Sequence, residues 1–274
     1  MRLHLRNEEG ALRTSSLRYV GRVANLSGMK IYSCLLILLF AAGLAPAQDA
    51  KPTTQGKFGP TVEIPADPTH QWKIENEYFR AYYVTVEPHQ STTMHHHGHD
   101  YVAVALGHTV IDVSAPDGTV KHVVLEDGDV RYTPAGVVHA VTNMAGTPFH
   151  NATIELLQNH GPVCVNNCAS DPRAKDWTPL TPESKLIGYG DGFRISEAVI
   201  KPQQTVSNEE AFPHLVILLT DRHAHTGPAG NGGMDFNDKA GSMMFHGGHP
   251  DHGFTNIGTQ DMRLIVMEFK PVKP

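Results

Sequence analysis

The chain has 274 residues, of which 40% are hydrophobic and 18% charged, with 18 histidines and a formal net charge of −6. This length and apolar content suffice for one or two hydrophobic cores. Frequent Gly and Pro without long helical periodicity argue against a helical bundle. The acidic balance argues against nucleic acid or an anionic membrane surface as a partner.

The N-terminal region has the pattern of an export signal. Met29-Lys30 precedes an apolar segment over residues 34–44, and Ala45-Pro46-Ala47 supplies small residues that favour cleavage after Ala47. The segment is shorter than the ~20 residues of a membrane-spanning helix. We therefore expect a periplasmic or secreted protein with no stable membrane insertion after cleavage, an uncleaved anchor being the alternative. Translation from Met1 and from Met29 both fit this interpretation.

Removal of residues 1–47 changes the charge balance of the mature chain. Six of the 22 Lys and Arg and two of the 28 Asp and Glu lie there, which leaves a formal net charge of −10. Only one of the 18 histidines is lost. The mature protein is therefore acidic and rich in histidine.

The rest of the chain contains two copies of one unit. Phe79-Arg80 recurs 114 residues later as Phe193-Arg194, and four further residues recur at an offset of 113: Gly128, His139, Asn143 and Glu155 as Gly241, His252, Asn256 and Glu268. Short β-branched or aromatic segments alternate with turn residues, which predicts antiparallel strands and a sandwich or barrel. We expect an upstream segment with signal peptide (1–47), an N-terminal unit (48–160), a linker (161–182) and a C-terminal unit (183–274).

Two cysteines, Cys164 and Cys168, lie in the predicted linker. In an oxidising compartment this pair favours a local disulfide that pins the linker. The alternative is a thiol pair for redox chemistry or metal binding, for which a C-x-x-x-C spacing is unusual.

The histidines of residues 93–101 carry the clearest chemistry. In a strand His95 and His97 share one face while His96 points to the other, and His99 falls in a turn. Two imidazoles spaced in this way can reach one metal ion, and a neighbouring strand must supply the third ligand. His139 follows a tight Pro-Gly turn into the next strand and is that candidate.

These two segments resemble the two motifs of the cupin superfamily. Residues 128–143 match G-x5-P-x-G-x2-H-x3-N at every specified position, and the first motif has an H-x-H pair followed by a Glu and a Gly. Counting back from Gly107 places Asp100 where that Glu belongs. The resemblance implies an all-β fold of two tandem cupin (jelly-roll-like, double-stranded) β-barrels. It implies a divalent transition metal on His95, His97 and His139, with Asp100 as a candidate fourth ligand. Iron or manganese is favoured, and zinc, nickel and copper are also compatible.

The function that the resemblance favours is an Fe- or Mn-dependent oxygenase of a small organic substrate, with Tyr101 and Asp100 as candidate catalytic groups. A metal-dependent lyase, decarboxylase or isomerase is the first alternative, and a non-catalytic small-molecule or metal-binding cupin is the second. Dimerisation is a family expectation. Candidate cavity contacts are Thr93, Met94, Tyr101, Tyr132 and Val141.

The second copy has lost most of the motif. Glu209, Ala211 and His214 stand at the positions of His95, His97 and Asp100, and His252 alone persists at the position of His139. We expect a structural unit without a metal. The alternatives are a weak relic site or a copper site formed by the Met- and His-rich residues 223–225 and 243–252.

Overall fold

A computed structural model describes residues 57–166, 168, 179–208, 212–227, 232–248 and 251–270. All of them belong to one compact unit, Asp49–Pro274. The expected signal segment, Glu209 and Ala211 lie outside the described residues, and so does the side chain of His252. Within the described ranges no helix has the length and hydrophobicity needed to cross a membrane.

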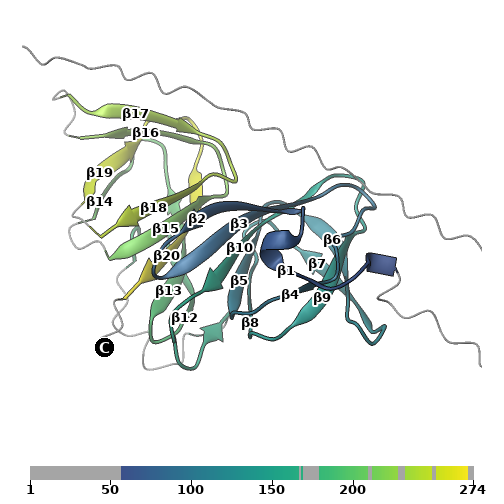
Figure 1. Cartoon of the computed structure of the whole chain (residues 1–274). Helices are drawn as coiled ribbons and strands as arrows, with labels where there is room; N and C mark the ends of the chain where they lie inside the picture. Colours follow the sequence, from purple (N-terminus) through teal and green to yellow (C-terminus); the bar gives the residue numbers. More distant parts are fainter. Residues whose placement is uncertain are drawn as a thin grey trace, which may run out of the picture. The chain divides into compact units, whose positions relative to one another are not determined.

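The first copy consists of two sheets (Figure 1). Residues of both sheets line a cavity between them. One has the order β1-β4-β9-β6-β7 and the other β2-β3-β10-β5-β8. A 3-10 helix, Ile64–Ala66, follows β1. The strands are β1 (Val62–Glu63), β2 (His70–Glu75), β3 (Phe79–Val86), β4 (His95–His96), β5 (Tyr101–Ala105), β6 (Thr109–Ser114), β7 (Val120–Leu125), β8 (Val130–Thr133), β9 (Val138–Asn143) and β10 (Phe149–Leu156).

The second copy repeats this topology. Its sheets have the orders β11-β12-β13-β20-β15-β18 and β14-β19-β16-β17. The strands are β11 (Cys164–Val165), β12 (Lys185–Tyr189), β13 (Phe193–Ile200), β14 (Thr205–Asn208), β15 (Pro213–Leu218), β16 (Arg222–Thr226), β17 (Met234–Asp238), β18 (Met243–Gly247), β19 (Asp251–Asn256) and β20 (Met262–Phe269). The predicted all-β fold of two related units is confirmed.

A buried asparagine shows how closely the two copies agree. The side-chain amide of Asn143 donates to the carbonyls of Val86 and Thr147, at 3.0 and 2.8 Å. Asn256 donates in the same way to Ile200 and Gln260, at 2.8 and 2.9 Å. Each asparagine therefore joins the end of β9 or β19 to the equivalent neighbouring segments, which explains why the repeat includes this residue.

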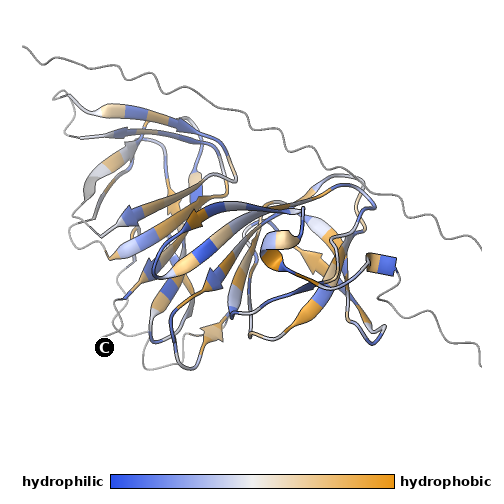
Figure 2. Cartoon of the chain, in the orientation of Figure 1, coloured by the Kyte–Doolittle hydropathy of each residue, from blue (hydrophilic) through white to orange (hydrophobic). Residues whose placement is uncertain are grey.

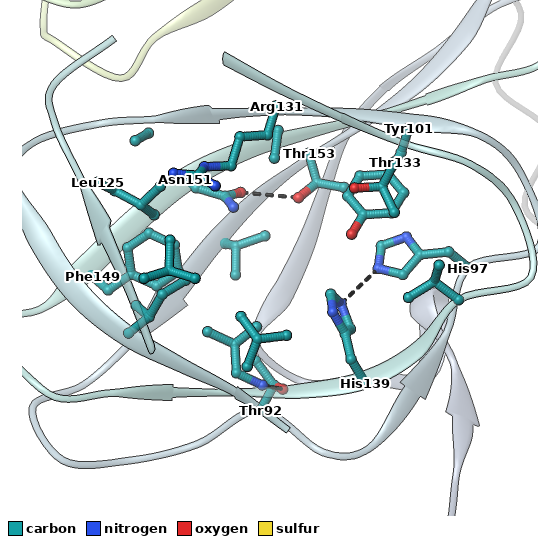
Figure 3. Close-up of a pocket in the computed structure, with 18 of the residues that line it drawn as sticks. Thr92, His97, Tyr101, Leu125, Arg131, Thr133, His139, Phe149, Asn151 and Thr153 are labelled. Atoms are coloured by element: carbon teal, nitrogen blue, oxygen red, sulfur yellow. Dashed lines mark hydrogen bonds between the residues drawn. The ribbon is translucent and has the colours of Figure 1, made fainter. Parts of the chain in front are cut away.

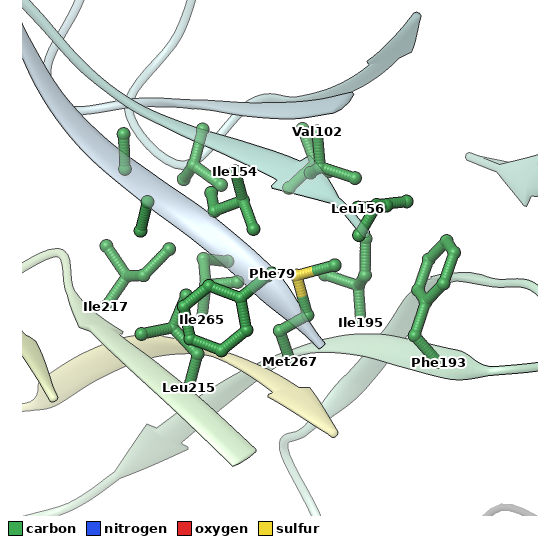
Figure 4. Close-up of a cluster of buried hydrophobic side chains, with 14 of the residues drawn as sticks. Phe79, Val102, Ile154, Leu156, Phe193, Ile195, Leu215, Ile217, Ile265 and Met267 are labelled. Atoms are coloured by element: carbon green, nitrogen blue, oxygen red, sulfur yellow. The ribbon is translucent and has the colours of Figure 1, made fainter. Parts of the chain in front are cut away.

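The main hydrophobic core lies between the sheets that contain β3 and β13. Apolar and polar residues are interspersed along these strands (Figure 2), and Phe79 and Ala81 of β3 and Phe193 and Ile195 of β13 belong to this core. Figure 4 shows residues of both copies in one cluster, and the rings of Phe79 and Phe269 stack with centroids 4.9 Å apart. The opposite face of the β3 sheet is left to line the cavity.

The predicted disulfide is confirmed between Cys164 and Cys168. It closes a loop beside β11, which pairs with β12. Part of the segment that the sequence marked as a linker thus joins the sheet of the second copy.

Candidate metal centre

Three histidines meet where β4 pairs with β9. His95 lies directly opposite His139 in the ladder, and His97 follows two residues after His95. Backbone hydrogen bonds fix His97, whose N–H donates to Val137 and whose carbonyl accepts from Gly136, at 3.0 and 2.8 Å. Ligand nitrogens of the three imidazoles lie within 4.8 Å of one another. The tight turn at Gly136 (φ +86°) therefore aligns the two motif segments.

The chemistry of this group fits a divalent transition metal. The Nε2 atoms of His97 and His139 are 3.1 Å apart, close to the spacing of two adjacent ligands that bind one ion at ~2.1 Å. Burial, together with the neighbouring imidazoles, lowers the pKa of His139 to about 3 and that of His97 further below its usual range. Both imidazoles are therefore neutral at physiological pH, which is the form that binds metals.

Asp67 and His70 support this group from outside the two motifs. Asp67 is 1% exposed, and its Oδ2 lies 3.0 Å from Nδ1 of His95 and 3.8 Å from Nδ1 of His70. Its Oδ1 accepts from the backbone N–H and the hydroxyl of Thr69, at 2.9 and 2.7 Å. Burial alone would raise the pKa of the Asp67 carboxyl, but its contacts with His70, His95 and Thr69 together hold it far below the usual range.

The surroundings of Nδ1 indicate which nitrogen of His95 is left to bind a metal, and Asp67 supplies one of two acceptor oxygens beside it. Nδ1 of His95 also lies 3.0 Å from the carbonyl oxygen of Thr93, so two acceptors surround it and it carries the proton. Nε2 is then left as the ligand atom, as in the carboxylate–histidine–metal arrangement of many metalloproteins. No local pattern indicates this role, because Asp67 precedes both motifs in the sequence.

A cavity of about 260 Å³ adjoins the histidines (Figure 3). His95, His97 and His139 line one end, and polar side chains from β5, β8 and β10 continue along one wall. The facing wall, from β6, β7 and β9, is mainly apolar and includes Ile111 and Val123, and it also carries Lys121. The ring of Tyr101 stacks on that of His97 at 3.7 Å, and burial raises the pKa of its hydroxyl. Tyr101 is thus a protonated phenol beside the three histidines.

Two of the five expected cavity contacts, Tyr101 and Val141, line the cavity. Thr93, Met94 and Tyr132 do not, and for them the prediction is wrong. Successive side chains of a strand point to opposite faces, so on β8 the cavity receives Arg131 and Thr133 while Tyr132 points away. Before β4 the alternation is interrupted, and Thr92 takes the place expected for Thr93.

Comparison with known proteins supports the fold. No protein-family model and no curated protein matches the sequence. The structure is similar to AerE from Microcystis aeruginosa (13% identity, TM-score 0.51, covering 74% of this chain and 98% of AerE). It is also similar to a variant of the salicylate 1,2-dioxygenase from Pseudoaminobacter salicylatoxidans (9% identity, TM-score 0.51, covering 79% of each chain). A cupin domain from Bordetella pertussis aligns with a shorter part (29% identity, TM-score 0.31, covering 32% of this chain and 90% of that domain).

The chain has the bicupin fold. Its first cupin unit brings His95, His97 and His139 together, as the motifs predicted. His96 points away from them and its Nδ1 lies 3.0 Å from Oε1 of Glu63, and His99 is exposed, which agrees with their expected exclusion.

Asp100 stands apart from the converging ligand atoms of the cupin site. Its carboxylate accepts hydrogen bonds from the hydroxyl of Tyr132 and from the N–H of Ala135 at 2.7 Å, and lies 2.9 Å from Nε2 of His160. These partners hold the pKa of the Asp100 carboxyl low, although burial opposes them. In this arrangement Asp100 fixes the turn that precedes His139.

The second cupin unit presents no comparable group among the described residues. His214 stacks on His246 with ring centroids 4.9 Å apart, and its Nδ1 lies 2.8 Å from the carbonyl oxygen of Phe212. Nδ1 of His225 lies 2.7 Å from Asp235. The described part of this unit therefore offers no focus for the copper site considered from the sequence.

Proposed function

We propose that the protein is an exported, metal-dependent oxygenase of a small organic substrate, with its site in the first cupin unit. The observation that carries the proposal is the meeting of three imidazoles, two of them buried, at one end of a cavity. Iron or manganese bound there would supply redox and Lewis-acid chemistry. Similarity to a dioxygenase of the same fold is consistent with this reaction class.

The residues around the histidines have distinct tasks in this proposal. The apolar wall excludes water from one side of the substrate and orients it toward the histidines. His139 is partly accessible and borders the cavity, whereas His95 and His97 are each 1% exposed, so the substrate approaches on the His139 side. Tyr101 holds a proton at its hydroxyl that it can donate to a substrate oxygen.

Tyr101 also favours a second candidate function. A protonated phenol beside a metal ion suits a lyase, decarboxylase or isomerase, in which proton transfer is the essential step. Dependence on oxygen separates the two functions, because only the oxygenase consumes it.

The test is elemental analysis of the mature protein, residues 48–274, purified without a His tag from the periplasm. We expect about one equivalent of iron or manganese, lost in His97→Ala and retained in His96→Ala, whose side chain is on the opposite face of the same strand. Oxygen uptake with phenolic, diketone and thiol substrates, under air and under argon, then tests the reaction. Metal content equal in both variants would refute the site, and turnover without oxygen would favour the second function.

A further inference from the structure

Arg131 differs from the other described arginines in having no carboxylate partner. No Asp or Glu oxygen among the described residues lies within 4.0 Å of its guanidinium, whose nearest hydrogen-bond acceptor is the carbonyl oxygen of Val124 at 3.4 Å. The remaining arginines of the described segments all form ion pairs: Arg80 with Glu75, Arg194 with Glu268, Arg222 with Asp238 and Arg263 with Asp127 and Glu197. Most of the five N–H donors of Arg131 are therefore available to a ligand.

The strand register directs this guanidinium into the cavity. Arg131 lies on β8 opposite Ala103 of β5, and Ala103 lies opposite Thr153 of β10. Ala103 and Ala105 have small side chains, which leaves room for the arm of Arg131 to extend over β5. Figure 3 shows Arg131 extending from its strand toward the end of the cavity where Asn151 lies, away from His97 and His139.

Asn151 adds a second donor at the same end. Its Oδ1 accepts the hydroxyl hydrogen of Thr153 at 2.9 Å, so its amide N–H groups are the part left to contact a ligand. Lys121 and Asp129 are the other charged residues that line the cavity, and Asp129 already accepts from the N–H of Glu126 at 3.1 Å. This end of the cavity therefore offers more hydrogen-bond donors, on Arg131 and Asn151, than free acceptors.

The rest of the cavity limits the size and polarity of a ligand. Leu125, Phe149 and the apolar wall would face its body. A cavity of ~150 Å³ holds benzene, so about 260 Å³ accommodates a substituted ring or a short chain. Arg131 is two residues from Thr133, which lies opposite Tyr101, and two strand residues span ~7 Å. A ligand that reaches from Arg131 to the histidines is therefore several ångströms long.

We infer that the cavity binds a small organic acid, with its carboxylate on Arg131 and Asn151 and its other end at the histidines. A guanidinium pairs with a carboxylate through two parallel hydrogen bonds. A carboxylate would therefore supply the acceptor oxygens that Arg131 lacks at this end of the cavity. That the acid is a substrate rests on the proposed function, whereas its binding does not.

The test is calorimetric titration of the mature protein with benzoate, pyruvate and hexanoate, each beside its uncharged amide. We expect at least one acid to bind about 10-fold or more tightly than its amide, because hydrogen bonds to charged groups are the stronger ones. Arg131→Gln should abolish this preference, and Arg222→Gln, which alters an arginine of the second cupin unit, should retain it. Similar unfolding midpoints of both variants would show that folding is unaffected.

Two results would overturn the inference: no acid preferred over its amide, or a preference that survives Arg131→Gln, including one that is lost in His97→Ala. That last case would place the carboxylate on the metal. Binding through Arg131 in a protein that holds no iron or manganese would refute the proposed oxygenase alone. Oxygen uptake by a protein without acid preference would refute the carboxylate site alone.

Discussion

Substituting Asn for Asp67 tests whether a residue outside both motifs sets the state of the metal ligands. Asn has the shape of Asp, and its oxygen can still accept from Thr69. Its NH2 group would then face Nδ1 of His95, which now lies 3.0 Å from a carboxylate oxygen. Two donors cannot face each other, so the substitution favours the tautomer with the proton on Nε2, the ligand atom.

The expected size of the effect follows from this contact. Loss of a carboxylate behind a ligating histidine typically weakens metal binding 10- to 100-fold, which is about 1.4–2.7 kcal/mol. Asp67 is 1% exposed, so water cannot replace the lost acceptor. The carbonyl of Thr93 still favours a proton on Nδ1 and keeps the effect within this range.

The assay is competition for Zn²⁺ between the metal-free protein and a chromophoric chelator, since three imidazoles suit zinc. Glu63→Gln is the matched control, because Glu63 lies at the same 3.0 Å distance from Nδ1 of His96 but its side chain is 67% exposed. His96 points away from the site, so we expect the zinc affinity to be unchanged. Equal affinities of Asp67→Asn and the unaltered protein would refute a role for Asp67 in holding His95.

Two further predictions concern stability. Asn143→Ala should lower the free energy of unfolding by about 3 kcal/mol in chemical denaturation, because buried backbone groups at both ends of a turn lose their partners; a loss below 1 kcal/mol would contradict this. In the metal-free protein, the free energy of unfolding should fall as the pH falls below 6.5, by about 1.4 kcal/mol per pH unit for each of His97 and His139. The reason is that these two imidazoles bind protons in the unfolded chain at this pH but not in the native state. For His139 the loss should end near pH 3, and His139→Ala should reduce the slope in denaturation series at several pH values.

The features that the sequence predicted correctly depend on short spacings. An H-x-H pair on one strand must share a face, and the constant offset between the copies reveals the repeat without any knowledge of packing. Asp67 and His70 could not be found in this way. They reach the site because β1 pairs with β4 while β2 joins the other sheet, so the intervening segment crosses between the sheets beside His95.

Cavity contacts were harder to predict than ligands because they require the parity of each strand. Moving a strand by one residue exchanges its two faces, which is why Tyr132 was expected in the cavity and Arg131 was not. The pairing of Tyr101 with Thr133 settles this parity, and no local pattern in the sequence indicates it.

The second cupin unit departs from the first at the supporting residues as well as at the ligands. At the offset of 114, Thr181 and Ser184 stand where the first unit has Asp67 and His70. The backbone turn is the same, since the N–H of Ser184 donates to Thr181 as that of His70 donates to Asp67, at 3.0 and 3.1 Å. Thr181, however, uses its hydroxyl to donate to the carbonyl of Val199 at 2.9 Å.

The turn therefore has a structural role that both units share, whereas Asp67 and His70 are specific to the first unit. If Asp67 served only to stabilise the turn, a threonine would suffice there, as it does in the second unit. The buried carboxylate carries a desolvation cost that threonine avoids, and the contacts that offset it include His70 and His95, which belong to the first unit alone. This comparison explains why a metal content of about one equivalent per chain is expected, with the first cupin unit as its location.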